Sequence, residues 1–154
     1  MIHLAPQPGT PVPDPDHVLR YVGKKHVDDG VANGSGFLAR VGEDAPSVNW
    51  MECFLLPVEN QVAEVAARRR IRYEKRAQLV LLNVGQTRSY VAQNATVPVQ
   101  LLFLHDPLDA DDRFPEDPSH AIINDVPVIN TPEGELIGDL LADCIIGIYP
   151  VAPD

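Results

Sequence analysis

The sequence predicts an α+β fold in a single domain, with a mainly antiparallel or mixed sheet and about three helices. The composition is the first reason: 154 residues with 45% hydrophobic and 22% charged content are typical of one globular domain. The second is that β-branched segments alternate with helix-like segments that begin at prolines. Because no repeat or linker interrupts this pattern, we divide the chain into an arm, 1–16, and one domain, 17–154.

The N-terminal part favours extended structure. Residues 1–16 contain five prolines, each of which removes a backbone donor, so the arm is expected to be extended and unpacked. Alternating side chains predict a short strand over 17–23, and the apolar segment 36–42 predicts a second one. The apolar positions of 47–57 fit a helical stripe as well as a buried strand, so both alternatives stay open there.

The middle of the chain combines a helix with strands. The segment 57–70 begins with proline, carries acidic residues in its first half and ends in three arginines. This order of charges suits the two ends of a helix dipole and predicts a helix. The following residues are rich in β-branched and apolar side chains and predict three strands of one sheet, over 78–85, 88–93 and 97–104.

The last third is expected to hold a loop and two helices. The acidic stretch 105–117 cannot bury itself, so it is predicted to be a surface loop. The segment 116–125 contains an Asp-Pro pair, the order of an N-cap and a first helical residue, and predicts a short helix. A Thr-Pro pair opens 131–149, whose apolar residues recur at helical spacing, and predicts the last helix.

The charge distribution limits the partners. The formal net charge is −10, so the field of the protein repels phosphate backbones and argues against general nucleic-acid binding. The charge is uneven: 68–76 holds six of the twelve basic residues, whereas 106–117 holds six acidic residues against one arginine. The chain therefore carries its own countercharge.

The basic segment is the strongest candidate for binding. If the helix continues through it, Arg69, Arg72 and Arg76 lie on one face and form a clamp for a phosphate, a specific nucleic acid or an acidic partner. The alternative is a solvated helix end that the acidic loop partly neutralises, with little effect on stability.

Cysteine use and hydropathy bear on the compartment. Only two cysteines occur and no secretory signal pattern opens the chain, so we expect a reducing cytoplasm. The longest apolar run, 144–149, is far below the ~20 residues that cross a bilayer, so no membrane span is expected. No His or Cys pair has the spacing of a zinc site, and we predict neither a metal nor a cofactor.

The segment 26–37, HVDDGVANGSGF, is the first candidate for chemistry. If His26, Asp28 and Ser35 converge, a carboxylate can orient the imidazole, which in turn activates a hydroxyl or a water. The alternative is a pair of tight turns in which Asp and Asn bond nearby amides. His120 belongs to a second polar cluster, 117–121, at an expected helix start that favours anions or simply caps the helix.

The sequence resembles a group of short, mostly uncharacterised bacterial proteins. The motifs are a D-x-G loop that leads to a Phe, a Ser-Val element and a late D/N-P-x-H-A segment, and the resemblance covers about residues 18–145. It implies no activity, but it marks the positions to examine: Asp28, Gly30, Ser35, Phe37, Ser47, Val48, Pro118, His120 and Ala121. Genes of this kind look like those of multi-gene bacterial conflict or regulatory systems.

Two hypotheses of function follow. The first is a non-catalytic accessory module that docks on another protein of the same system through its uneven charge, its arm and its acidic loop. The second is a small enzyme or sensor that binds a nucleotide or another phosphate-bearing ligand in one cleft formed by Arg20, His26, Asp28, Ser35 and His120. The second requires the two polar clusters to meet in space.

Overall fold

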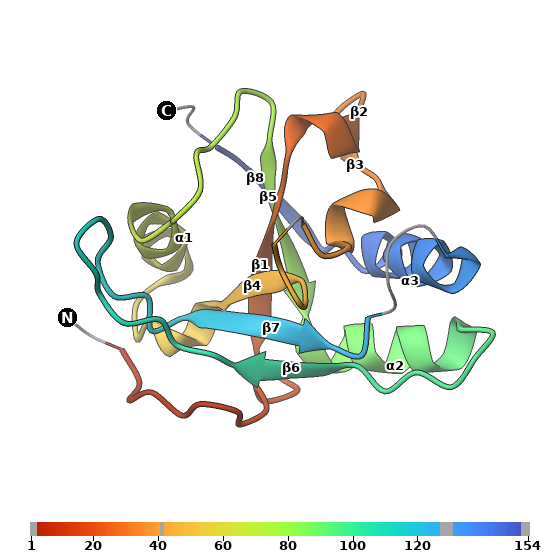
Figure 1. The fold of residues 1–154 in the computed structure, drawn as a ribbon, viewed down its shortest axis with the longest axis horizontal. Coiled ribbons are helices and arrows are strands. Elements are labelled where there is room, and N and C mark those ends of the chain that lie inside the picture. Colours follow the sequence, from red (N-terminus) through yellow and green to blue (C-terminus); the bar gives the residue numbers. More distant parts are fainter. Residues whose placement is uncertain (1–2, 41, 127–130, 152–154) are drawn as a thin grey trace.

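In the part of the chain that the structure describes, a six-stranded antiparallel sheet and three α-helices form a single domain, which confirms the α+β prediction (Figure 1). The computed structural model describes residues 3–40, 42–126 and 131–151. In the described residues the strand order is β6-β7-β4-β1-β5-β8. These strands are β1 (His17–Val22), β4 (Ser47–Trp50), β5 (Gln78–Asn83), β6 (Leu102–His105), β7 (His120–Asn124) and β8 (Gly147–Pro150).

The central strand β1 separates two apolar cores, because its successive side chains point to opposite faces of the sheet. Val18 and Val22 lie in the larger core, on the side of α2 (Val84–Asn94) and α3 (Pro132–Asp143). Leu19 belongs to the smaller core, on the side of α1 (Val58–Ala67). The predicted strand over 17–23 is therefore confirmed, and both faces of it are covered.

The chain between β1 and β4 differs from the prediction. The described residues of 36–42 do not form a strand: Gly34–Phe37 is a 3-10 helix, η2, and Asn33 caps it by accepting a hydrogen bond from the Ser35 amide. The carbonyls of Gly36 and Leu38 bond to Arg20 instead of a neighbouring strand. The ambiguous segment 47–57 resolves into β4 followed by another 3-10 helix, η3 (Met51–Cys53).

Two segments in the middle of the chain differ from the prediction. The helix expected over 57–70 ends at Ala67, because the arginines after it bond to the acidic loop and Tyr73 packs into the smaller core. The segment 88–93, expected to be a strand, belongs to α2, which begins where the Asn83 side chain caps the Gln86 amide. Only the end of the predicted strand 97–104 pairs, as β6.

The C-terminal elements also differ in part. The segment 116–125 forms strand β7 and not a helix, because Asp117 folds a turn through Ser119 and β7 then pairs with both β4 and β6. Thr131 caps α3 as expected, with a bond from the Gly134 amide. The helix predicted over 131–149 ends at Asp143, and its last apolar residues form the outermost strand, β8.

The proline-rich arm is extended, yet it packs against the domain. Its backbone bonds to β6 on the edge opposite β7, with Val12 N donating to Phe103 O at 2.7 Å and His105 N donating to Thr10 O at 2.8 Å. Val12 is 3% exposed. The arm therefore covers one edge of the sheet, which an unpacked tail does not do.

Within the described ranges no helix combines the length and the apolar character that crossing a bilayer demands.

Candidate functional site

The segment 26–37 is a tight hairpin followed by a capped turn. Val27–Asp28 (β2) pairs with Val31–Ala32 (β3), and the two residues between them, Asp29 and Gly30, have φ values of 50° and 77°. Positive φ at both central residues is the geometry of a type I′ hairpin turn, for which Asp-Gly is a preferred pair. The alternative of two turns, left open from the sequence, describes this segment.

His26 and Ser35 do meet, but the bonds run in the wrong direction for catalysis. His26 Nδ1 lies 2.6 Å from Ser35 Oγ, and Ser35 Oγ in turn bonds to Asn33 Oδ1. A hydroxyl has one proton, and Asn33 Oδ1 can only accept it, so His26 Nδ1 is left to donate to the serine. A general base has to accept that proton.

The carboxylate of the cluster does not orient the imidazole either. Asp28 Oδ2 accepts a hydrogen bond from Asn33 Nδ2 at 3.0 Å, and no bond joins Asp28 to His26 in the described residues. Burial and the positive charge of Lys25 lower the pKa of His26, so the imidazole is neutral at pH 7. The four side chains form a network that fixes the hairpin, with Asn33 at its centre, which accepts from the Ser35 amide as the two-turn alternative expects of an Asn.

His120 lies at the start of β7, within a second polar cluster. Its Nδ1 bonds to Asp106 O at 2.8 Å and lies 3.2 Å from an Asp106 carboxylate oxygen. Asp117 is buried, and it accepts bonds from Asn49 Nδ2 at 3.0 Å and from Ser119 Oγ at 2.7 Å. These bonds join the acidic loop to β4 and β7.

The two polar clusters lie on opposite faces of the sheet. His120 pairs with Asn49, which pairs with Leu19, and residues directly opposite each other share a face. Leu19 faces α1, whereas Val22, three positions along, faces η2 and α3, next to His26. In Figure 1 the β2–β3 hairpin and the start of the β7 arrow lie far apart across the molecule. The single cleft required by the enzyme hypothesis is not formed.

Arg20 is buried, and its side chain binds backbone carbonyls. Its guanidinium donates to the carbonyls of Gly36, Ser47 and Leu38 at 2.9, 2.8 and 2.9 Å. Burial lowers its pKa to about 9, which keeps it charged at pH 7, and a Glu43 oxygen lies 3.9 Å away. With 1% exposure, Arg20 does not reach a ligand and instead holds the segment between β1 and β4 in place.

Glu43 completes this arrangement. Burial raises the pKa of its carboxyl, but hydrogen bonds from the Arg40 amide and the Ser47 side chain, together with the charges of Arg20 and Arg40, outweigh burial and lower it. The Arg40 amide donates at 2.6 Å. Glu43 is therefore ionised at neutral pH.

The predicted arginine clamp does not exist as a helix face, because Arg69, Arg72 and Arg76 lie beyond the end of α1. The basic segment divides into two halves. The first half contacts the acidic loop, residues 106–117: Arg68 Nη1 donates to Glu116 O at 2.6 Å, and Arg70 lies 3.5 Å from an Asp111 carboxylate oxygen. The acidic loop therefore supplies the countercharge for this half of the basic segment, as inferred from the sequence.

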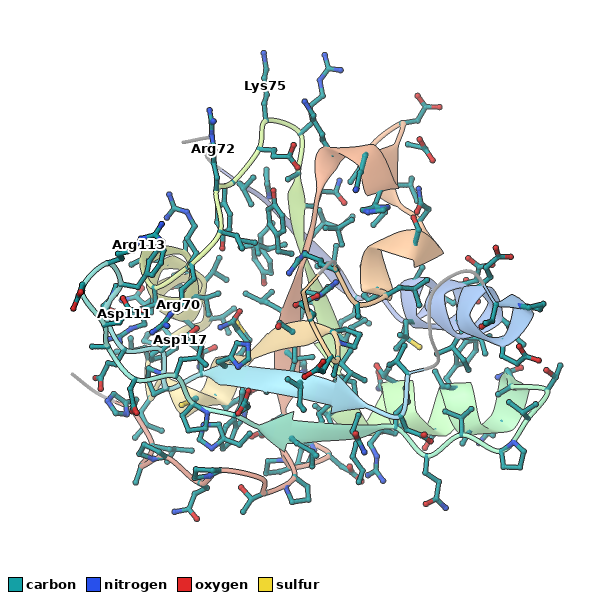
Figure 2. The ribbon with its side chains drawn as sticks, viewed as in Figure 1. Arg70, Arg72, Lys75, Asp111, Arg113 and Asp117 are labelled. Atoms are coloured by element: carbon teal, nitrogen blue, oxygen red, sulfur yellow. The ribbon has the colours of Figure 1, made fainter. Side chains whose placement is uncertain are left out.

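The second half is exposed. Arg72, Lys75 and Arg76 are exposed, and so are Lys24 and Lys25 in the 3-10 helix η1 (Lys24–His26) that follows β1. Within 3–40, 42–126 and 131–151, none of these five side chains has an ion pair. Arg76 and Lys24 border the same hollow, which brings the two segments together. We call these five residues the basic ridge, and Figure 2 shows Arg72 and Lys75 projecting away from the protein.

A stack of side chains stands next to the ridge. The Tyr21 and Tyr73 rings are parallel within 8° with centroids 5.0 Å apart. Arg40 lies over Tyr21 at 5.3 Å from the ring centroid, and Arg69 lies over Tyr73 at 4.6 Å. Tyr21, Tyr73 and Arg40 were not singled out in the sequence, because nothing local shows that these distant residues meet.

The described residues hold neither a candidate metal cluster nor a cysteine whose pKa is lowered. No group of three His, Cys, Asp or Glu side chains with metal-binding geometry occurs in the described residues. Both cysteines are free, and burial raises the pKa of Cys53 to about 11 and that of Cys144 above its usual value. The thiols are therefore protonated at neutral pH.

Comparisons with protein families, with curated proteins and with solved structures found no match to this chain.

Proposed function

We propose that the protein is a non-catalytic accessory module that docks an acidic segment of a partner protein, encoded in the same multi-gene system, on the basic ridge. The observation that carries the proposal is the ridge itself: five exposed cations with no ion pair in the described chain, on a protein with a net charge of −10. Both cysteines are free thiols, which accords with a cytoplasmic setting because thiols are kept reduced there.

The charge of the ridge fits an acidic partner. The acidic loop neutralises the arginines nearest to it, but it leaves Arg72 and Lys75 unpaired. At physiological ionic strength the Debye length is about 8 Å, so a docked segment responds to these nearby cations more than to the distant negative charge. Tyrosine and arginine are also enriched at the centres of protein interfaces, and the Arg40–Tyr21–Tyr73–Arg69 stack adjoins the ridge.

The enzyme or sensor alternative is less well supported. It needs His26, Ser35 and His120 in one cleft, whereas the first two lie on the η2 side of the sheet and the third on the α1 side. We therefore keep a phosphate-bearing ligand only as an outcome of the test.

The test uses a fluorescein-labelled peptide rich in Glu and Asp, with a Lys-rich peptide of equal length as its control, and measures anisotropy at low and high salt. The double variant Arg72→Glu/Lys75→Glu is expected to bind the acidic peptide about tenfold more weakly, because each exposed pair contributes up to ~1 kcal/mol and 1.4 kcal/mol is tenfold in affinity. Raising the salt concentration is expected to weaken wild-type binding as well.

Arg113→Glu is the matched control, since Arg113 is an exposed arginine on the acidic loop. Equal weakening in this control overturns the assignment of the ridge, and so does the absence of acidic-peptide binding. A thermal shift with a nucleotide but none with the peptide favours the phosphate-ligand alternative.

A further inference from the structure

A hollow of about 140 Å³ lies on the α1 side of the sheet, and we infer that it binds a single carboxylate group. The two tyrosines of the stack and the three arginines beside them line it, and Asn49, Asp117 and His120 line it as well. The inference deepens the proposed function, on which it rests for the source of the carboxylate: an acidic side chain of the docked partner. A free small acid is the other source of the same chemistry.

More arginines than carboxylates line the hollow. Arg40, Arg69 and Arg70 line it, against the carboxylates of Glu43 and Asp117. Both carboxylates are already bonded within the protein: Glu43 accepts from the Arg40 amide, and Asp117 accepts from Asn49 and Ser119. An arginine offers five N–H donors in a fixed plane, so Arg40 and Arg70 keep donors for a further planar acceptor beside their own ion pairs with Glu43 and Asp111, both at 3.5 Å.

Stacking fixes two of these guanidiniums. Arg40 lies on the Tyr21 ring while its Nη2 donates to Tyr21 O at 2.6 Å, and Arg69 lies on the Tyr73 ring while its Nη1 donates to Ala66 O at 2.6 Å. Because these side chains are held before a ligand arrives, little rotamer entropy is lost on binding. The two tyrosines stack on each other and set the distance between the arginines.

Arg70 supplies an independent indication. Its Nη2 donates to the carbonyls of Asp109 and Pro115, at 2.5 and 3.1 Å, but its Nε is buried and has no hydrogen-bond partner. Buried donors are nearly always paired, so an unpaired one on a side chain that lines a cavity calls for an acceptor. A carboxylate in the hollow is such an acceptor, after a small rotation of the side chain.

The size of the hollow selects among anions. A cavity of ~150 Å³ holds a molecule as large as benzene, whereas drug-sized ligands and cofactors occupy ~300–1,000 Å³. One side-chain carboxylate or a small organic acid therefore fits into about 140 Å³, and a nucleotide does not. The apolar walls, from Leu79 and Leu108, suit the methylene groups that precede the carboxylate.

The experiment is an NMR titration of the ¹⁵N-labelled full chain, with the arginine Nε–Hε signals as the readout. The probes are N-acetylglutamate, acetate, inorganic phosphate and the Glu- and Asp-rich peptide. We expect saturable shifts of the Arg70 Nε–Hε signal with the carboxylates and the peptide, and none with phosphate below the concentration that moves all exposed arginines equally.

Two variants and one control make the outcome specific. Arg40→Gln is expected to weaken carboxylate binding roughly tenfold, the effect of one charged hydrogen bond. Ile71→Trp places a larger side chain at the hollow without changing its charge and is expected to abolish binding; Ile71 is 39% exposed, so folding tolerates the change. Arg113→Gln, whose arginine does not line the hollow, is expected to bind like the wild type.

The outcomes separate this inference from the proposed function. Peptide binding that depends on Arg72 and Lys75 but leaves the Arg70 signal unmoved overturns the carboxylate site and leaves the docking function standing. Binding of N-acetylglutamate without the peptide supports the site with a free acid as its ligand and overturns the docking function. Equal affinity for phosphate and the carboxylates, or Ile71→Trp binding like the wild type, overturns the inference.

Discussion

Replacing Arg20 is expected to destabilise the protein strongly, although arginine is usually a surface residue. In Arg20→Met the apolar stem is roughly preserved, but the three bonds to the carbonyls of Gly36, Ser47 and Leu38 are lost. A buried group left without a partner costs ~1–3 kcal/mol, which gives ~3–9 kcal/mol for three carbonyls. Removal of a buried charge offsets part of this, since desolvating an ion costs several kcal/mol. We therefore expect a net loss of about 3–5 kcal/mol in the free energy of unfolding.

The assay is urea unfolding followed by the fluorescence of Trp50, the single tryptophan, which is 8% exposed in the folded protein. Low temperature keeps enough of the variant folded to define the folded baseline, because stability reaches its maximum at roughly 10–20 °C.

Arg20→Lys tests the geometry separately: one ammonium group cannot replace a planar fork that reaches three carbonyls, so this variant is expected to lose about 2–3 kcal/mol of unfolding free energy. Arg113→Met is the surface control. A loss below ~1 kcal/mol in Arg20→Met refutes the reasoning, because surface-like behaviour means that the carbonyls find other donors.

Three further changes test other contacts. Gly34→Ala is expected to lower the free energy of unfolding by about 2–3 kcal/mol in thermal or urea unfolding, because a Cβ there lies 2.5 Å from the Asp139 backbone nitrogen of α3. Gly147→Ala is the control: a Cβ there has its nearest contact at 3.4 Å, so the loss is expected to be well below ~1 kcal/mol. Similar losses in the two variants contradict this. Glu43→Gln is expected to be ~1–2 kcal/mol less stable than the wild type at pH 7. Folding lowers the pKa of Glu43, so the stability that its carboxylate contributes is complete above the usual pKa of 4.5 and is lost as the pH falls through the folded pKa. The difference in unfolding free energy between wild type and Glu43→Gln, measured by urea unfolding, is therefore expected to shrink in acid. A difference that stays constant with pH contradicts the role of an ionised Glu43. Asp117→Asn places an amide donor against groups that donate to the carboxylate and is expected to lose about 2 kcal/mol, with a wild-type melting temperature as the contrary result.

Local signals in the sequence determined part of the fold. The alternation in 17–23 predicted a short strand, which is β1. Thr131 and the proline after it marked the start of α3, and Asp-Gly at 29–30 marked a tight turn, which joins β2 and β3. Each of these features depends on residues that are neighbours in the chain, so the sequence contains everything they need.

The predicted helix and strand assignments are wrong where tertiary contacts outweigh the local preference of the residues. The β-branched and aromatic residues of 88–93 favour a strand, yet they form α2, whose buried Val91 packs in the larger core. The Asp-Pro pair of 116–125 resembles a helix start, but β7 gains pairing with β4 on one side and β6 on the other. Propensities are worth less than ~1 kcal/mol per residue, and burial in a shared sheet exceeds them.

By itself, the sequence determined the class of fold, the candidate polar side chains and the opposition of a basic and an acidic segment. Only the tertiary structure decided that Arg20 is buried, that His26 and His120 face opposite sides of the sheet, and that Arg40, Tyr21, Tyr73 and Arg69 form one stack. The reason is that the face on which a side chain lies depends on strand order and register, which are set by the burial of all the apolar surface at once and not by the residues next to it in the chain.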